Sequence, residues 1–215
     1  MRMFNSDGSE SEMCGNASRC IGKYVYEKGL TDKTEITLET LAGVKVLKLW
    51  MNEENEVEKV TVDMGMPVLD ASSIPAAFKQ SPVIKCLLPV SDDTTYEVTS
   101  VSMGNPHAVL FMDKIDELDL PEIGPVVEHS PYFPNRTNTE FVEVVSDRWL
   151  KMRVWERGAG ETLACGTGAC AAVVAGVLNG LVGRSATVQL RGGDLEIEWS
   201  EDDNRVYLTG DAVTV

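Results

Sequence analysis

Apolar and polar positions alternate along most of this chain, with β-branched and aromatic residues at many of the apolar positions. A period of two residues is typical of a β-strand that packs one face against a core. We therefore expect a protein built mainly of short strands. The alternation places them at residues 1–4, 35–38, 44–50, 59–63, 96–101, 108–112, 139–145, 149–155, 187–190, 195–199 and 206–208.

Two segments have the pattern of helices, residues 15–28 and 166–179, and each is followed by a glycine, Gly29 and Gly180. Glycine commonly ends a helix because it adopts the left-handed conformation without strain. The second segment is apolar on nearly every side from Ala169 to Leu178. A helix of that kind is buried all round, so we expect a curved sheet to wrap it.

The chain repeats itself when it is aligned on Cys14 and Cys165. The positions that match at fixed offsets from the two cysteines are Phe4 and Trp155, Glu10 and Glu161, Gly15 and Gly166, Gly29 and Gly180, and Leu30 and Leu181. Such matches indicate a duplicated unit. We expect two similar domains of mixed α/β class, residues 1–66 and 67–215, each with a curved, mostly antiparallel sheet around a central helix.

Charge and composition exclude several classes of function. The chain has 215 residues, with 34 acidic and 19 basic side chains and a net charge of −15. Such a surface repels phosphate backbones, so nucleic acid is not an expected partner. No apolar stretch approaches the roughly 20 residues of a membrane span, and no signal peptide is evident. We expect a cytoplasmic protein without membrane contact.

The five cysteines are too widely spaced for a zinc site, and their odd number argues against a disulfide framework. Three of them, Cys20, Cys86 and Cys170, are expected to be small buried apolar residues. The repeat sets Cys14 and Cys165 apart, because each stands at the start of an expected helix. We expect no metal in this protein.

A helix start has chemical consequences for a cysteine. The partial positive charge there lowers the pKa of a thiol, and the unpaired N–H groups of the first turn bind anions. Gly15 and Asn16 in one unit, and Gly166 and Thr167 in the other, would supply these N–H groups. If the two units face each other, a substrate carboxylate would lie between both helix starts.

In that arrangement a thiol stands on each face of the substrate's α-carbon. One cysteine would remove a proton as a thiolate while the other returns a proton as a thiol, and the roles would swap for the opposite enantiomer. The helix dipoles would stabilise the charge that develops on the carboxylate. The residues therefore predict racemisation or epimerisation without a cofactor, with Cys14 and Cys165 as the catalytic pair.

The motifs around these cysteines resemble those of the diaminopimelate epimerase family. They are MCGNA at residues 13–17, SMGNPH at 102–107, FPNRTN at 133–138 and ERGAGETLACGTGA at 156–169. The related proline racemases share the paired cysteines, whereas the phenazine-type isomerases lack them. The resemblance implies two α/β domains and the interconversion of LL- and meso-diaminopimelate, a step toward lysine and peptidoglycan precursors.

The resemblance also implies a binding site for the distal amino-acid head of diaminopimelate. Glu156 would hold its ammonium group, and its carboxylate would be held by Asn5, Asn105, Asn138 and Arg157. For His107 two roles stay open, either assistance in deprotonating a cysteine or support from behind the site. Two other readings of the whole chain also stay open: a racemase of another amino acid, and a ligand-binding fragment without activity.

Compared with the second unit, the first unit lacks a strand-rich stretch before its cysteine, and the family's final strand is also not evident. We therefore expect the first domain to be truncated by roughly 60 residues, as judged from the repeat. Its helix, with Ile21, Tyr24 and Val25, would then show an apolar side to water or to a partner chain in a homodimer. The activity of the chain would be weakened.

Overall fold

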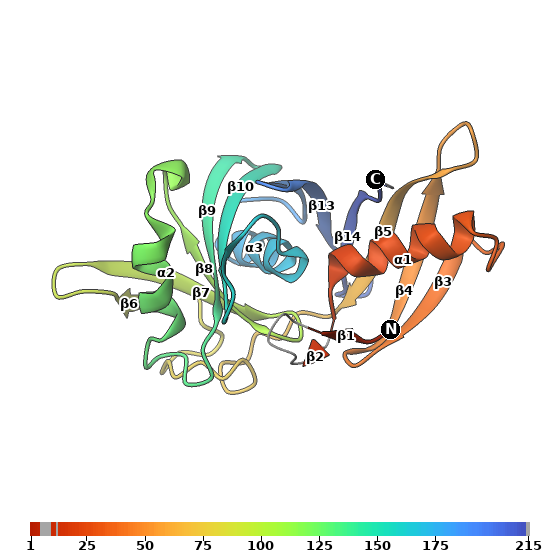
Figure 1. Ribbon diagram of the computed structural model, residues 1–215. Helices are drawn as coiled ribbons and strands as arrows, with labels where there is room; N and C mark the ends of the chain where they lie inside the picture. Colours follow the sequence, from red (N-terminus) through yellow and green to blue (C-terminus); the bar gives the residue numbers. More distant parts are fainter. Residues whose placement is uncertain (5–9, 12, 214–215) are drawn as a thin grey trace.

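The computed structural model of the protein describes residues 1–4, 10–11 and 13–213 (Figure 1). Each strand expected from the alternation forms, and both expected helices form. The elements are β1 (Met3–Phe4), β2 (Glu10–Ser11), α1 (Gly15–Glu27), β3 (Glu35–Thr40), β4 (Gly43–Met51), β5 (Val57–Gly65), β6 (Cys86–Pro89), β7 (Thr95–Ser102), β8 (Pro106–Phe111), η1 (Ile115–Glu117), α2 (Leu120–Glu128), β9 (Asn138–Ser146), β10 (Trp149–Glu156), β11 (Gly160–Thr162), α3 (Gly166–Leu178), β12 (Ser185–Leu190), β13 (Gly193–Trp199) and β14 (Val206–Asp211).

One long curved sheet runs through both halves of the molecule. Its strand order is β3-β4-β5-β14-β13-β12-β10-β9-β8-β7-β6, and β11 pairs with β10 outside this path. Most neighbours are antiparallel, but β8 and β9 are parallel, as are β10 and β12. The last described strand, β14, pairs with β5. The two halves therefore share a sheet, where the repeat alone led us to expect one sheet in each unit.

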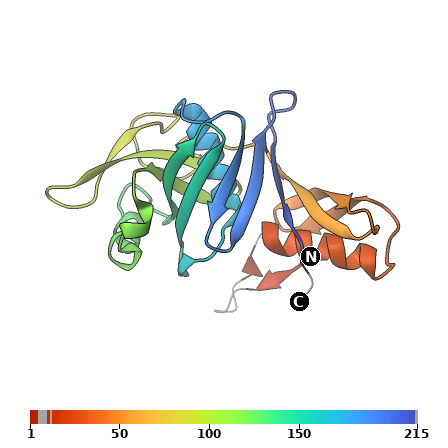
Figure 2. The ribbon, with the colours of Figure 1, turned by 90° about the horizontal axis from the view of Figure 1, so that it is seen from above.

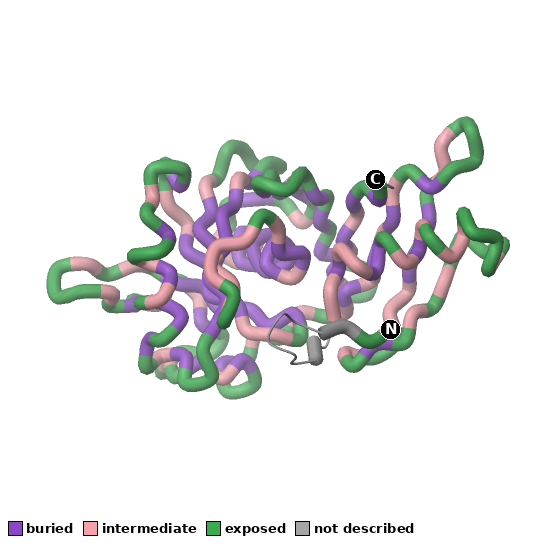
Figure 3. Tube along the Cα trace, viewed as in Figure 1, coloured by how far each residue is buried: buried purple, intermediate pink, exposed green. Residues whose placement is uncertain are grey.

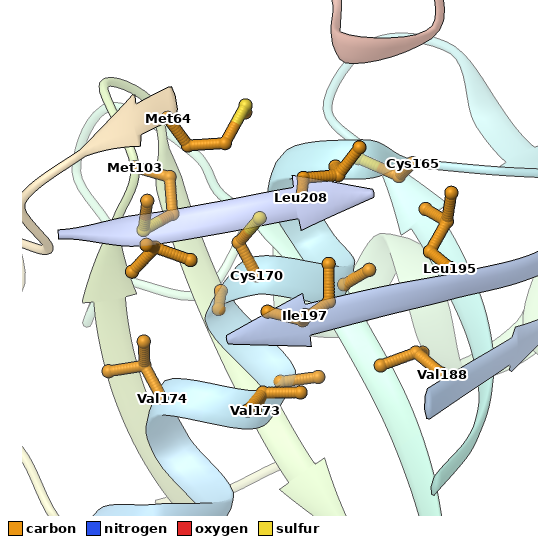
Figure 4. Close-up of a cluster of buried hydrophobic side chains, with 14 of the residues drawn as sticks. Met64, Met103, Cys165, Cys170, Val173, Val174, Val188, Leu195, Ile197 and Leu208 are labelled. Carbon is orange, nitrogen blue, oxygen red and sulfur yellow. The ribbon is translucent and has the colours of Figure 1, made fainter. Parts of the chain in front are cut away.

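Helix α3 lies inside the curve of this sheet and contacts β7, β8, β9, β10, β12, β13 and β14. Ten of its thirteen residues, from Gly166 to Gly176, are buried. Figure 4 shows Val173, Val174 and Cys170 of α3 among side chains of the surrounding strands. The expectation of a helix wrapped by sheet is confirmed, and its apolar surface on every side is the reason.

Helix α1 packs differently. Its buried residues are Gly15, Ser18, Arg19 and Gly22, and it lies on β4, β5 and β14. At Gly22 a Cβ atom would lie 3.0 Å from Leu49 Cδ2, so the small residue lets the helix approach the sheet closely. The opposite side is open to solvent, and Tyr24 is 58% exposed. Figure 3 shows the contrast between α1 and the buried α3.

The sheet around β8 is covered on both faces, with α3 on one side and α2 on the other (Figure 2). Alternate residues of a strand point to opposite faces. Ala108 and Leu110 of β8 pack in the cluster beside α2, whereas Val109 packs in the cluster beside α3. His107 of β8 and Glu140 of β9 share the parity of the residues that face α3. This alternation directs two polar side chains toward the start of α3.

The sequence analysis did not predict α2, because Pro121, Gly124 and Pro125 are unfavourable residues in a helix. Pro121 stands in its first turn, where a missing N–H costs nothing. Gly124 lies so close to Trp155 that a Cβ atom there would be 2.3 Å from the ring. In the part of the chain that the structure describes, no helix is both long enough and apolar enough to cross a membrane.

Candidate functional site

The structure brings the starts of α1 and α3 together. Cys14 and Cys165 are the N-cap residues of the two helices and have nearly the same extended backbone, with φ/ψ of −139°/117° and −130°/108°. A Cβ atom on Gly166 would lie 3.7 Å from the Cα atom of Gly15, and Leu208 of β14 packs beside both glycines. The two cysteines therefore precede two glycines whose backbones touch.

Both helices begin in the same way. The Ser18 N–H donates to the Cys14 carbonyl, and the Ala169 N–H donates to the Cys165 carbonyl, each at 3.0 Å. The N–H groups between each cysteine and these donors belong to the first turn, which lacks intrahelical acceptors. They are the groups we predicted for anion binding. The side chain of Asn16 is engaged elsewhere, because its Oδ1 accepts from Arg19 Nη1 at 3.1 Å.

Cys165 departs from the expectation of a lowered pKa. Its side chain is buried, with 6% exposed, and this burial raises the pKa of the thiol well above its ordinary value. The carboxylate of Glu156 raises the pKa further, as would that of Glu140 in its ionised form, while the Thr167 hydroxyl and the Gly168 N–H lower it. Loss of hydration is therefore the largest cause of the raised pKa, and it disfavours the charged thiolate. Cys14 at the other helix start is half-buried.

A chain of polar contacts leads away from the Cys165 sulfur. Sγ lies 3.5 Å from Thr167 Oγ1, which accepts a hydrogen bond of 3.3 Å from Asn105 Nδ2. Asn105 Oδ1 lies 3.0 Å from His107 Nε2. His107 Nδ1 lies 2.7 Å from Glu140 Oε1. The side chains of Thr167, Asn105 and His107 thus connect the thiol to the buried carboxyl group of Glu140.

In the contacts that the structure records, His107 lies against Asn105 and Glu140 and not against a cysteine. The imidazole is fully buried, and its two nitrogens face Asn105 and Glu140. Sequence reasoning missed Glu140. A signal was present, because this glutamate stands in an expected strand directly before the apolar residues Phe141 and Val142. An acidic side chain there must be buried against a partner or lie at a strand edge.

The turn that carries Glu156 and Arg157 is held by two buried polar side chains. Asn138 accepts from the Arg157 N–H and donates to the Pro106 carbonyl, each at 2.9 Å. Glu128, which the sequence analysis also missed, accepts from Gly158 N–H at 2.9 Å and from Trp155 Nε1 at 2.7 Å. These contacts fix the backbone from which the two charged side chains project.

The remaining predicted binding residues are placed as follows. Glu156 accepts from the Thr162 hydroxyl, and Arg157 Nη1 donates to the Asn135 carbonyl at 3.4 Å. The side chain of Asn138 braces the turn, so only part of its amide remains for a ligand. Asn5 lies outside the described residues. Among the residues that the structure describes, no three His, Cys, Asp or Glu side chains gather as a metal site.

All five cysteines are free thiols. Cys170 is fully buried, as expected, and burial raises the pKa of its thiol well above the ordinary value. Cys86 is half-buried. The expectation was wrong for Cys20, which is exposed on the open side of α1. That side of α1 meets solvent, as the exposure of Tyr24 also shows.

The fold is shared with solved structures of low sequence identity. A hydroxyproline epimerase from Agrobacterium vitis, solved with trans-4-hydroxy-L-proline, superposes with a TM-score of 0.71 at 14% identity and covers all of this chain and 68% of its own. A probable proline racemase from Agrobacterium radiobacter K84 gives a TM-score of 0.69 at 16% identity, over all of this chain and 69% of its own. These structures confirm the mixed α/β fold with a curved sheet.

Sequence comparison is more specific. A family model described as diaminopimelate epimerase matches residues 1–69 and 99–215. The diaminopimelate epimerase of Methanococcus maripaludis strain C6 is 58% identical over 215 residues, which are all of this chain and 77% of that protein. The diaminopimelate epimerase of Desulfovibrio desulfuricans is 58% identical over 221 residues, covering all of this chain and 76% of its own length. The chain therefore belongs to the diaminopimelate epimerase family.

Proposed function

We propose that this protein interconverts LL- and meso-diaminopimelate by proton transfer at one α-carbon, with Cys14 and Cys165 as the two acid–base groups and without a cofactor. The observation that carries the proposal is the contact between Gly15 and Gly166, which joins two helix starts that each begin after a cysteine. A cytoplasmic place and a role in forming lysine and peptidoglycan precursors follow from the family and belong to the same proposal.

The substrate α-carboxylate would lie between the two helix starts. The N–H groups of Gly15 and Gly166 and the two helix dipoles favour an anion there. Removal of the α-proton leaves an electron pair that delocalises into the carboxylate, where these groups stabilise it most. The thiolate takes the α-proton from one face, and the thiol gives its proton to the opposite face. The two cysteines exchange protonation states, and no other reactant is consumed.

The environment of Cys165 assigns the first roles. Because burial and nearby carboxyl groups raise the pKa of Cys165, this residue stays a thiol in the resting protein and would act as the acid. Cys14, on the half-buried side of the pair, would act as the base. After one turnover the roles are reversed, which prepares the protein for the opposite enantiomer.

The turn at residues 156–158 would bind the distal end of the substrate. Diaminopimelate carries an amino-acid head at both ends, and Glu156 and Arg157 offer one charge of each sign. Arginine binds a carboxylate with two parallel hydrogen bonds. Asn105 and Asn138, with Asn5, would add neutral donors. Proline has no second head, so these charges would be left unpaired in a proline racemase.

The division into two units, residues 1–66 and 67–215, is part of the proposal. The substrate would lie where the units meet, since α1 belongs to the first and α3 to the second. The shared sheet through β5 and β14 supports a fixed relation between the two helix starts. A homodimer in which a partner covers α1 remains part of the same proposal, supported by the exposure of Tyr24.

The test is deuterium incorporation at the α-carbon in heavy water. LL-diaminopimelate, meso-diaminopimelate and L-proline are incubated separately with the protein, and exchange is followed by proton NMR. We expect exchange of both diaminopimelate isomers and none of proline. Exchange of proline alone would establish a different racemase, and no exchange of any substrate would leave a ligand-binding protein. An Arg157→Lys variant should weaken diaminopimelate exchange through KM while retaining both cysteines.

A further inference from the structure

The buried carboxyl group of Glu140 is not explained by the reaction proposed above. Its side chain is fully buried, and its Oε2 has no hydrogen-bond partner among the residues that the structure describes. Its Oε1 lies against the first turn of α3, because a Cβ atom on Gly168 would be 2.7 Å from it. The same Cβ atom would be 3.3 Å from Cys165 Sγ. A carboxyl group and a thiol therefore flank one glycine.

At the Cys165 end of these contacts, the donor and the acceptor of each hydrogen bond can be assigned. An amide nitrogen only donates, so Asn105 Nδ2 donates to Thr167 Oγ1. Since this oxygen already accepts from Asn105, the hydroxyl proton of Thr167 is available for Cys165 Sγ. The chain therefore ends with a donor aimed at sulfur, which favours the thiolate form.

The donors and acceptors can also be assigned at the His107 imidazole. An amide oxygen only accepts, so His107 Nε2 must carry the proton that it shares with Asn105 Oδ1. One further proton then lies between His107 Nδ1 and Glu140 Oε1. Burial raises the pKa of Glu140, although the imidazole acts in the opposite direction. A neutral Glu140 that donates to Nδ1 also avoids a carboxylate beside the sulfur.

We propose that Glu140 is a positioning residue that, in its protonated form, holds His107 as the Nε2–H tautomer and so directs every hydrogen bond of the chain through Asn105 and Thr167 toward Cys165. The proposal rests on the proposed function, in which Cys165 becomes a thiolate after it protonates the substrate. Glu140 acts through His107, whose tautomer is set by the group on its other nitrogen. The carboxyl group of Glu156, at the end of β10, also faces Cys165 and raises the pKa of its thiol.

An amide can donate a hydrogen bond as a protonated carboxyl group does, so two substitutions of Glu140 distinguish its protonated form from its ionised form. In Glu140→Gln the side-chain NH₂ can donate to His107 Nδ1, so the direction of the chain is kept. In Glu140→Leu there is no donor, and His107 can adopt the other tautomer. An ionised Glu140 would behave differently, because both substitutions would remove the same negative charge beside the sulfur.

The first measurement is the rate of Cys165 alkylation by iodoacetamide between about pH 6 and pH 10, a range that brackets the ordinary thiol pKa. Cys165 and Cys170 lie on the same peptide, so fragment-ion mass spectrometry is used to locate the label on Cys165. We expect Glu140→Gln to react within about twofold of the original protein, whereas Glu140→Leu and Thr167→Val react at least about tenfold more slowly at neutral pH, corresponding to about one pKa unit. Equal acceleration in both Glu140 variants would overturn the proposal.

The second measurement reads the tautomer directly. The chain has two histidines, and His129 is largely exposed, so the ¹⁵N NMR spectrum of the side chains is simple to assign with a His107→Gln variant. We expect the Nε2–H tautomer in the original protein and in Glu140→Gln, and its loss in Glu140→Leu. An unchanged tautomer in Glu140→Leu would refute the role of Glu140. Neither measurement requires turnover, so a failure of the proposed function would be seen separately in the exchange assay.

Discussion

Gly15 and Gly166 bring the two helix starts into backbone contact, since a Cβ atom on Gly166 would lie 3.7 Å from Gly15 Cα. The same atom would lie 3.1 Å from Leu208 Cδ1, so the space beside the contact is nearly full. Glycine is required here for close approach and not for an unusual φ angle. In the proposed mechanism, this contact sets how near Cys14 and Cys165 come to the substrate α-carbon.

A larger side chain at this contact should separate the helix starts. We expect Gly166→Val to lower kcat/KM for α-proton exchange by about 10²-fold, the size of effect that a displacement of about 1 Å produces. Gly183→Val is the control, because the nearest atom to a Cβ there is 3.8 Å away and the residue is exposed. Exchange assays and thermal melts of both variants make the comparison. Equal activity of the two would show that the contact does not set the geometry.

Removal of either thiol of the pair should abolish epimerisation in both directions. An acid or base in the transition state contributes typically about 10²–10⁴-fold, so Cys14→Ala and Cys165→Ala should each lose at least that much. Cys20→Ala, an exposed cysteine of the same helix as Cys14, should keep its activity. Near-normal turnover in either single variant would contradict the two-base mechanism. Circular dichroism should show that all three variants remain folded.

The fold was largely predictable because its elements depend on local patterns. Alternation placed the strands, and the glycines at 29 and 180 ended the helices with φ of +66° and +69°. The apolar surface of α3 on every side predicted the wrapping sheet. Helix α2 was missed because prolines are poor helix formers, and only its packing on Trp155 shows why Gly124 is there. The pairing of β5 with β14 joins distant parts of the chain, so no local pattern predicts it.

The site was predictable only in part, because burial is a property of the whole fold. The motif around Cys165 predicted a helix start, and from that a lowered pKa. The folded chain instead buries the thiol, and this loss of hydration, together with the nearby carboxylate of Glu156, raises the pKa. The sequence analysis missed Glu140 for a similar reason, because its partner His107 is 33 residues away in the sequence. Its place in a buried strand was the one available signal.

Mild oxidation should inactivate the protein reversibly. Cys14 and Cys165 precede two glycines that lie close together, so we expect a small movement to bring their Cα atoms within the about 7 Å that a disulfide requires. We expect oxidant to abolish α-proton exchange and reductant to restore it. Peptide mapping should find Cys14 joined to Cys165. A disulfide between Cys20 and Cys170 instead would mean that the site is misplaced, although Cys170 is fully buried and Cys20 is exposed.

Alkaline pH should reveal the buried thiol of Cys165. Because its pKa is raised in the folded protein, the folded chain keeps a proton that the unfolded chain releases above about pH 8.5. Stability therefore falls as pH rises above that value, by up to about 1.4 kcal/mol per pH unit for this group. Cys165→Ala should show a shallower fall in urea unfolding. Val173→Ala, which removes no titratable group, should keep the original slope, and a parallel curve for Cys165→Ala would exclude the raised pKa.

The two central helices should differ in local stability. Ten residues of α3 are buried, whereas α1 buries four and leaves Tyr24 58% exposed. Segments with few buried apolar contacts open more easily, so the amides of α1 should exchange with deuterium well before those of α3. Substitutions should agree, with Tyr24→Ala changing the free energy of unfolding by less than about 0.5 kcal/mol and Val173→Ala lowering it by about 2 kcal/mol. Equal protection of the α1 and α3 amides, or an equal loss of stability in Tyr24→Ala and Val173→Ala, would mean that the open side of α1 is covered in solution. Sedimentation velocity would then show whether a second copy of the chain covers it.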